Sequence, residues 1–300
     1  MIYLSGNDEC ADCGLKGPEW ASYNLGIFLC TRCAACHRSM GAHISKIKHL
    51  KLDQWEDAQV TRMREVGNNN AKLKYERWVP PSYRRVDKDT PQILVEQWIF
   101  AKYAREEFIH PERQSYTSGF MEGYLMKKGR ENNQFLPRKF VLSEIENTVK
   151  YYVKDKKDPK AVIKISDINV AFSPKKIPFP NALQIDYLKD GSTRHIYVYH
   201  DDPQTVVNWY HAIRCCKLHL LQVGYPSVSY NLLMKKSELL SQEAESELLS
   251  HLSQDYVKEG YLSKTGPSPK DVYKKRWCTL EGRKLMYHVD PLDAYAKVNV

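Results

Sequence analysis

The sequence lacks any long hydrophobic run. No stretch of its 300 residues approaches the roughly 18 consecutive apolar residues that a transmembrane helix needs. The apolar opening over residues 1–4 is too short, and too soon followed by Asp8 and Glu9, to be the core of a secretory signal. We therefore expect a soluble, cytoplasmic protein. With 42% hydrophobic and 27% charged residues, the chain can bury two or three modest cores, which excludes wholesale disorder and a fibrous protein.

Cysteine is too scarce for a secreted protein that is held together by disulfides, since only 8 of the 300 residues are Cys. Most of them gather in the first 36 positions, as Cys10, Cys13, Cys30, Cys33 and Cys36. This clustering indicates a metal site rather than disulfides. The formal net charge of +9 favours partners that carry phosphate, but charge alone does not separate nucleic acid, an anionic membrane and a nucleotide.

Two Cys-x2-Cys pairs stand sixteen residues apart, and each pair can present both sulfurs to one ion at roughly 2.3 Å. Four thiolates fill a tetrahedral zinc shell, so no position is left for an activated water. The spacing therefore predicts one structural Zn²⁺ bound by Cys10, Cys13, Cys30 and Cys33, with iron or two disulfides as the alternatives.

Cys36 could compete as a ligand through the pair Cys33-x2-Cys36, but we expect it to be a small buried hydrophobe. His37 could also bind metal. Because four cysteines already suffice, we expect His37 to pack or to form hydrogen bonds instead.

The finger resembles that of the Arf GTPase-activating proteins, in which C-x2-C-x16-C-x2-C is followed after four residues by an arginine. In this chain that residue is Arg38, and the flanking segments 18–29, 52–55 and 67–68 are similar to the family as well. The resemblance covers roughly residues 8 to 110. It implies that Arg38 is an arginine finger that enters the nucleotide site of a GTP-bound Arf-type GTPase, so the chain would not hydrolyse GTP itself. A planar, permanently charged guanidinium suits the charge that develops on the γ-phosphoryl oxygens.

The chain departs from the family at two places. Ala34-Ala35-Cys36 stands where the family usually has a small residue, Gly and then Ile or Val, and only nine residues precede Cys10. These departures keep a second hypothesis open, in which the chain is a catalytically weak membrane adaptor.

Residues 53 to 110 are expected to form helices around the finger. Asp53 would cap the first helix, and Gly67 would end it. Its apolar face includes Trp55, Val60 and Met63; a second apolar set is Leu73, Tyr75 and Trp78; a third helix from about Thr90 presents Ile93, Leu94, Trp98 and Tyr103. We expect these aromatic residues to lie in the core.

A β-module is repeated later in the chain. Residues 122–125 recur as 259–262, and in both copies a basic-aromatic strand and a Tyr-containing strand follow. The first copy continues through further strands over 161–165, 183–188 and 194–199 to an amphipathic helix after Pro203. The set resembles a pleckstrin-homology (PH) domain at about residues 119 to 222.

The PH resemblance implies a basic cup for inositol phosphates at the open end of the first strands. Its predicted members are Lys127, Lys128, Arg138 and Tyr151 in the first copy, and Lys264, Lys274 and Arg276 in the second. Leu136 occupies the place of one basic residue that phosphoinositide-binding PH domains carry. The alternative is that these cations belong to an ordinary solvated face.

The second copy reaches only Val300, 42 residues from Glu259, whereas such a domain needs about 100. We expect an incomplete record of a longer protein, or a splice form with a poorly folded tail. Leucines at 239, 240, 248, 249 and 252 suggest linker helices.

The predicted architecture is therefore multidomain α+β: a small α/β zinc-finger domain at 1–110, a PH-type β-sandwich with a C-terminal helix at 119–222, a helical linker at 223–256 and a partial second PH domain at 257–300. This order resembles the dual-PH Arf GTPase-activating proteins of the centaurin-α type. It implies peripheral recruitment to phosphoinositides of the plasma membrane. A nucleic-acid-binding zinc protein is the remaining alternative, disfavoured because no dense basic helix follows Cys33.

Overall fold

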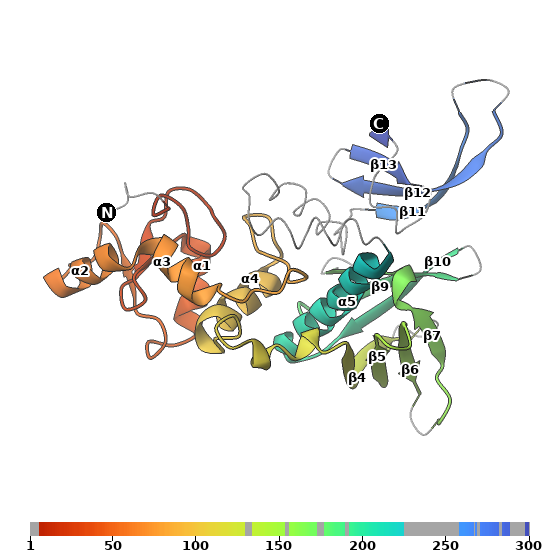
Figure 1. Cartoon of the computed structure of the whole chain (residues 1–300), viewed down its shortest axis with the longest axis horizontal. Helices are drawn as coiled ribbons and strands as arrows, with labels where there is room; N and C mark the ends of the chain where they lie inside the picture. Colours follow the sequence, from red (N-terminus) through yellow and green to blue (C-terminus); the bar gives the residue numbers. More distant parts are fainter. Residues whose placement is uncertain are drawn as a thin grey trace. The chain divides into compact units, whose positions relative to one another are not determined.

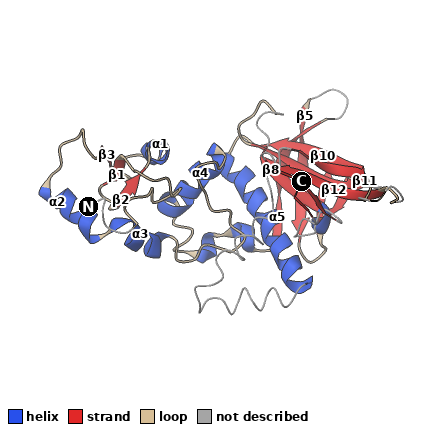
Figure 2. Ribbon diagram, turned by 90° about the horizontal axis from the view of Figure 1, so that it is seen from above, coloured by secondary structure: helices blue, strands red, loops and turns tan. Residues whose placement is uncertain are grey.

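A computed structural model describes residues 6–129, 134–153, 156–172, 177–189, 192–224, 258–266, 268, 271–281, 284–288 and 298–299. The chain divides into two compact units, Met1–Ser115 and Tyr116–Val300. Figure 1 follows the chain through both units, and in Figure 2 the strands, drawn in red, belong mainly to the second unit. Among the helices that the structure describes, none combines the length and apolar character that a membrane span requires.

The first unit contains a three-stranded antiparallel sheet in the order β2-β1-β3, formed by β1 Trp20–Ser22, β2 Ile27–Leu29 and β3 Ile47–His49. Gly26 makes the turn between β1 and β2 with a φ of +76°, and a Cβ there would lie 2.5 Å from the Cβ of Val66. Glycine is therefore required at this turn. Ala21, Phe28 and Met63 form a buried cluster beside the sheet.

Four α-helices and a π-helical turn complete the first unit: α1 Thr31–Ser39, α2 Asp57–Glu65, α3 Gly67–Tyr75, α4 Gln92–Ile99 and η1 Phe100–Ala104, followed by the 3-10 turns η2 Pro111–Arg113 and η3 Ser115–Thr117. Trp98 and Tyr103 are buried, as expected for core aromatics.

The helix ends differ from the sequence expectation in two ways. Glu56, not Asp53, caps α2, because Glu56 and Gln59 form a capping box, and the Asp53 carboxylate instead accepts a hydrogen bond from His49 N. Gly67 not only separates two helices but also begins α3, with a φ of +66°.

The second apolar set lies partly at the surface. Trp78 was expected in the core but is 48% exposed, and Leu73 is 74% exposed.

The second unit contains a seven-stranded antiparallel sheet in the order β7-β6-β5-β4-β10-β9-β8. Its strands are β4 Phe120–Lys128, β5 Phe135–Ser143, β6 Thr148–Tyr152, β7 Ala161–Lys164, β8 Ile168–Phe172, β9 Ala182–Lys189 and β10 Ser192–Tyr199, with the 3-10 turn η4 Ile165–Asp167 before β8. Strand β8 was not predicted from the sequence, although its burial alternates from residue to residue as a half-buried strand requires.

Helix α5, Pro203–Gly224, packs on this sheet. The Asp202 carboxylate accepts hydrogen bonds from Thr205 N at 2.8 Å and from the Thr205 hydroxyl at 2.6 Å, so Asp202 caps the helix. The Trp209 ring lies 6.1 Å from that of Phe140, centroid to centroid. The fold is a PH-like β-sandwich closed by a C-terminal helix, as predicted.

A further antiparallel sheet in the order β11-β12-β13-β14 lies after the linker, formed by β11 Lys258–Lys264, β12 Lys274–Glu281, β13 Lys284–His288 and β14 Val298–Asn299. The predicted linker helices, with their leucines at 239 to 252, lie outside the described residues.

Candidate functional site

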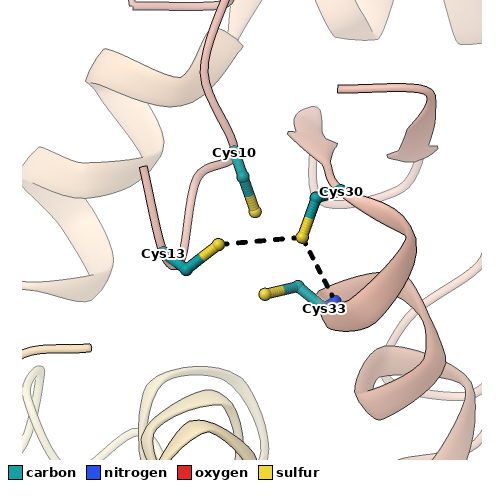
Figure 3. A group of neighbouring side chains, drawn as sticks. All are labelled: Cys10, Cys13, Cys30 and Cys33. Atoms are coloured by element: carbon teal, nitrogen blue, oxygen red, sulfur yellow. Dashed lines mark hydrogen bonds between the residues drawn. The ribbon is translucent and has the colours of Figure 1, made fainter. Parts of the chain in front are cut away.

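The four predicted zinc ligands come together in the first unit. The Sγ atoms of Cys10, Cys13, Cys30 and Cys33 all lie within 4.8 Å of one another, and all four residues are buried. Cys30 caps helix α1, and its Sγ accepts a hydrogen bond from Cys33 N at 3.5 Å. Figure 3 shows the four side chains pointing toward a common centre. Two loops that are far apart in sequence therefore present one set of sulfur donors.

The spacing of these sulfurs fits a tetrahedral zinc ion. Zinc–sulfur bonds of about 2.3 Å put ligand atoms about 3.8 Å apart at the corners of a tetrahedron, and the Sγ atoms of Cys13 and Cys30 are 3.7 Å apart. Ligation also requires thiolates. Hydrogen bonding by Cys13 lowers the pKa of Cys10 to about 6, and hydrogen bonding by Cys10 and Cys13 lowers the pKa of Cys30. The same hydrogen bonds raise the pKa of Cys13 and of Cys33, so without a metal the four sulfurs share protons, and the assignment rests on their number and spacing. The donor set thus suits a structural zinc.

Cys36 stays outside the sulfur cluster. It is buried on α1, where its Sγ accepts a hydrogen bond from Gln92 Nε2 at 3.3 Å, and burial raises its pKa to about 11. The expectation of a small buried residue is confirmed. The departure at Ala34-Ala35-Cys36 is accommodated within the regular helix α1.

Arg38 lies near the end of α1 with its side chain at the surface. Its guanidinium carbon is 4.2 Å from the centroid of the Trp20 ring on β1, a cation–π contact. The Trp20 ring in turn meets His49 edge-on at 4.8 Å. Within the part of the chain that the structure describes, no carboxylate forms an ion pair with Arg38. A permanent cation is therefore presented at the surface on an aromatic support.

A buried ionic cluster lies behind the finger. The Lys102 Nζ is 3.0 Å from Asp12 Oδ1 and 3.0 Å from Glu76 Oε1, and all three side chains are at most 5% exposed. Burial raises the pKa of Asp12, but Lys102 and His37 outweigh it and leave that pKa below its usual value. Burial lowers the pKa of Lys102, but Tyr103, Asp12 and Glu76 raise it well above the usual value. The cluster is therefore ionised and ties the loop of the first cysteine pair to η1.

In the second unit, Lys127, Arg138 and Tyr151 share one face of the sheet. Arg138 pairs with Leu125, two residues before Lys127, and Tyr151 pairs with Phe140, two residues after Arg138. Directly paired residues share a face, and every second residue of a strand returns to it. The Lys127 Nζ lies 5.2 Å from the centroid of the Tyr151 ring. These three predicted cup residues therefore lie on the same side of neighbouring strands.

Lys128 lies on the opposite face of β4, because side chains alternate along a strand. Its Nζ is 5.7 Å from the centroid of the Tyr197 ring on β10. The structure thus brings Lys127, and not Lys128, onto the face of Arg138.

The same arrangement recurs in the later sheet. Arg276 pairs with Leu262, two residues before Lys264, and Tyr287 pairs with Cys278, two residues after Arg276. The Lys264 Nζ lies 4.7 Å from the centroid of the Tyr287 ring. Lys, Arg and Tyr thus occupy identical register positions in both sheets.

The two sheets differ at the position that pairs with this lysine. Leu136 pairs with Lys127 in the first, whereas Lys274 pairs with Lys264 in the second. The second arrangement therefore holds one more cation on the same face.

Comparison with known proteins identifies both units. Residues 1–112 match the ArfGap family of GTPase-activating proteins for Arf, and residues 119–217 match the PH domain family. The chain is 42% identical over 294 residues to Arf-GAP with dual PH domain-containing protein 2 of Mus musculus, covering 97% of this chain and 73% of that protein. It is 42% identical over 299 residues to the protein of the same name from Homo sapiens, covering 99% and 74%. The chain belongs to the family of Arf GTPase-activating proteins with dual PH domains.

A further relative matches a shorter stretch of the chain. Stromal membrane-associated protein 1 of Mus musculus is 45% identical over 102 residues, which is 34% of this chain and 22% of that protein.

Some site residues were not predicted from the sequence. For the ArfGap unit, these are Asp12 and Trp20. Asp12 stands between two cysteines of the sulfur cluster, and the sequence does not show that Asp12 is buried. Trp20 lies in the segment that carried the resemblance. For the second sheet, the residue is Tyr287, which the repeat could have found by analogy with Tyr151.

Proposed function

We propose that the chain stimulates GTP hydrolysis by a GTP-bound Arf-family GTPase and that Arg38 supplies an arginine finger in trans. The observation that carries the proposal is the exposed guanidinium of Arg38, held over Trp20 at the end of the helix that also carries Cys33. A finger must be both presented and oriented before the partner arrives. The membership of the ArfGap family supports the choice of partner.

The expected contribution of Arg38 follows from the charge that it meets. Phosphoryl transfer spreads negative charge over the γ-phosphoryl oxygens, and an arginine finger accelerates it by about 10³ to 10⁵. That range corresponds to roughly 4–7 kcal/mol of transition-state stabilisation. Lysine would be a poor replacement, because it offers a point charge without the planar, bidentate fork.

The sulfur cluster is proposed to hold one structural Zn²⁺ through Cys10, Cys13, Cys30 and Cys33. Bound there, the ion supplies a tetrahedral crosslink between two loops and no Lewis-acid step, because four thiolates leave no open coordination position. Cys30 and Cys33 carry α1, and therefore Arg38, on this crosslinked base.

The basic faces of the β-sheets are proposed to bind phosphoinositide headgroups. Lys127, Arg138 and Tyr151 would serve one site, Lys264, Lys274 and Arg276 another, and Lys128 would contribute charge from the neighbouring face. Such binding would recruit the chain from the cytoplasm to the plasma membrane and raise its concentration near membrane-bound GTPase. The proposed domains are the zinc-finger domain at 1–110, the first PH domain at 119–222, the linker at 223–256 and the partial second PH domain at 257–300.

The test is single-turnover hydrolysis by a GTP-loaded Arf-family GTPase on vesicles with and without phosphoinositide. The native chain should accelerate hydrolysis, Arg38→Lys should lose at least about 10³ of that acceleration, and phosphoinositide should increase the native effect. Arg32→Lys is the matched control, since Arg32 lies on the same helix but donates hydrogen bonds to Gln92 and Thr90.

Two results would contradict the proposal. Absence of any acceleration by the native chain leaves only a membrane adaptor. Full acceleration by the Arg38→Lys variant removes the arginine finger while leaving GTPase activation in place.

A further inference from the structure

A buried line of hydrogen bonds crosses the first unit and passes through His37. Asp12 Oδ1 accepts a hydrogen bond from Lys102 Nζ at 3.0 Å, and Asp12 Oδ2 lies 3.0 Å from His37 Nε2. On the other side of the ring, His37 Nδ1 is 2.8 Å from Ser45 Oγ, and Ser45 Oγ donates to Ser22 Oγ at 2.8 Å. The line therefore runs from η1 through the metal loop and α1 to strand β1.

The His37 ring is hydrogen-bonded at both of its nitrogens. Ser45 Oγ donates to Ser22 Oγ, and Ser22 Oγ donates in turn to Asn24 Oδ1. The bonds to Asp12 and to Ser45 occupy His37 Nε2 and Nδ1, which lie on opposite sides of the ring. Neither Asn nor Gln can reach both partners, because each places a single nitrogen at one end of the space that the ring spans.

The position of His37 fixes the direction of its neighbour. His37 and Arg38 follow each other in the last turn of α1, and successive side chains of a helix diverge by about 100°. The His37 side chain is fully buried, whereas Arg38 is exposed and lies over Trp20. Any rotation of the last turn that moved Arg38 would have to break a hydrogen bond of His37.

The segment after α1 is fastened by the same side chain. Gly41 turns the chain with a φ of +90°, and Ser45 N donates to Gly41 O at 3.1 Å. Because Ser45 Oγ is also hydrogen-bonded to His37 Nδ1, the loop that follows Arg38 is closed back onto the helix that carries it. Both sides of Arg38 are thus held by one imidazole ring.

We propose that His37 is the positioning residue for Arg38. Its two hydrogen bonds, to Asp12 and to Ser45, hold the end of α1 in the orientation in which the guanidinium can reach the partner's nucleotide. This role rests on the proposed role of Arg38 and adds the residue that orients its side chain. A misplacement of about 1 Å at a reacting centre costs about 10²-fold in rate, which sets the scale of the expected effect.

The test measures single-turnover GTP hydrolysis by a GTP-loaded Arf-family GTPase as a function of the concentration of the 300-residue chain. His37→Gln keeps a polar group toward Asp12 but loses Ser45, and Ser45→Ala removes only the hydroxyl. We expect a maximal rate about 10- to 100-fold lower for the first variant and about 10-fold lower for the second, with an unchanged half-saturating concentration. His110→Gln, at an exposed histidine of the same unit, should behave as the native chain.

Two further measurements separate positioning from folding. Each variant should retain one zinc per chain, measured by atomic absorption, and the native melting temperature within a few degrees. In an Arg38→Ala background, His37→Gln and Ser45→Ala should cause no additional loss of rate, because there is no guanidinium left to aim.

Each contrary outcome has a distinct meaning. A native rate in both variants, an equal loss in the Arg38→Ala background, or a higher half-saturating concentration at full maximal rate overturns the positioning role while leaving the arginine finger intact. Native activity of Arg38→Ala itself overturns the finger, and His37 with it. If His37→Gln loses zinc, Ser45→Ala decides by the same criteria.

Discussion

The two units of the chain place their functional cations in opposite ways. In the first unit, Lys102 is 1% exposed and lies between two buried carboxylates, whereas Arg38 is presented at the surface over the Trp20 ring. In the second unit, the predicted cup residues are all partly accessible and are placed by strand register alone. The first site therefore depends on a buried polar interior and on the proposed metal, whereas the second depends on an apolar core. Substitutions should consequently act differently on the two.

Loss of the metal site should produce the largest difference in stability between the two units. We expect Cys13→Ser, or chelation of the native chain, to unfold residues 6–115, because structural zinc contributes about 10–16 kcal/mol, as much as the whole stability of a domain. Hydrogen exchange followed by mass spectrometry measures this in each unit separately. The strands of the second unit should keep their protection; persistent protection of α1 after chelation would show that sulfur packing alone holds the finger.

Removal of one buried carboxylate should have the next largest effect. We expect Glu76→Gln to lower the free energy of unfolding of the first unit by about 3 kcal/mol, because it leaves Lys102 short of a charge partner. Glu122→Gln is the matched control in the second unit: Glu122 is 48% exposed and pairs with Lys139, so we expect at most about 1 kcal/mol.

The pH dependence of this difference follows from the pKa of Glu76. Burial raises that pKa, but Lys102 and Arg85 outweigh it and leave it below the usual 4.5. A carboxyl with a depressed folded-state pKa stabilises the fold above its unfolded pKa and loses this contribution as the pH falls through the folded value. The gap in melting temperature between the native chain and Glu76→Gln should therefore be widest near neutral pH and close in acid. A constant gap would assign the loss to packing.

Removal of the cup arginines should affect membrane binding without affecting stability. We expect Arg138→Ala and Arg276→Ala each to weaken sedimentation with phosphoinositide vesicles by about tenfold, since a charge-assisted hydrogen bond is worth about 1.5–3 kcal/mol. Lys139→Ala removes a cation from the same strand as Arg138 but from the opposite face, where it pairs with Glu122. Equal weakening by Lys139→Ala would show general charge attraction instead of a defined cup.

The smallest predicted effect concerns the position that pairs with the cup lysine, which is Leu136 in the first sheet and Lys274 in the later one. We expect Leu136→Lys to strengthen binding to phosphoinositide vesicles by about fivefold, because a lysine near an anionic surface contributes about 1 kcal/mol. Lys274→Leu should produce the reverse change in the later sheet. Leu136→Gln, which adds polarity without charge, should leave binding at the native level; an equal gain from Gln would point to relief of exposed apolar surface.

Much of this organisation was predictable from local patterns. The spacing of the four cysteines predicted a common site, and the repeat at residues 122 and 259 predicted two sheets with matching Lys and Arg positions. Both features depend on short-range geometry, which sequence spacing determines directly.

The remaining features depend on contacts between distant residues. Asp12 meets Lys102 across ninety positions, and no local pattern marks either of them as partners. Burial was wrongly expected at Trp78, because apolar spacing alone does not say how much of a helical segment the rest of the unit covers. The side-chain environment of Arg38, which decides how the finger is held, likewise required the fold.

The loop between the first two cysteines serves two structures at once, since Asp12 lies between Cys10 and Cys13 while its carboxylate holds Lys102 and His37. A protein engineer who wished to weaken the proposed activity without disturbing the sulfur cluster should leave that loop intact. Ser45, at the opposite end of the hydrogen-bonded line, is the place to begin.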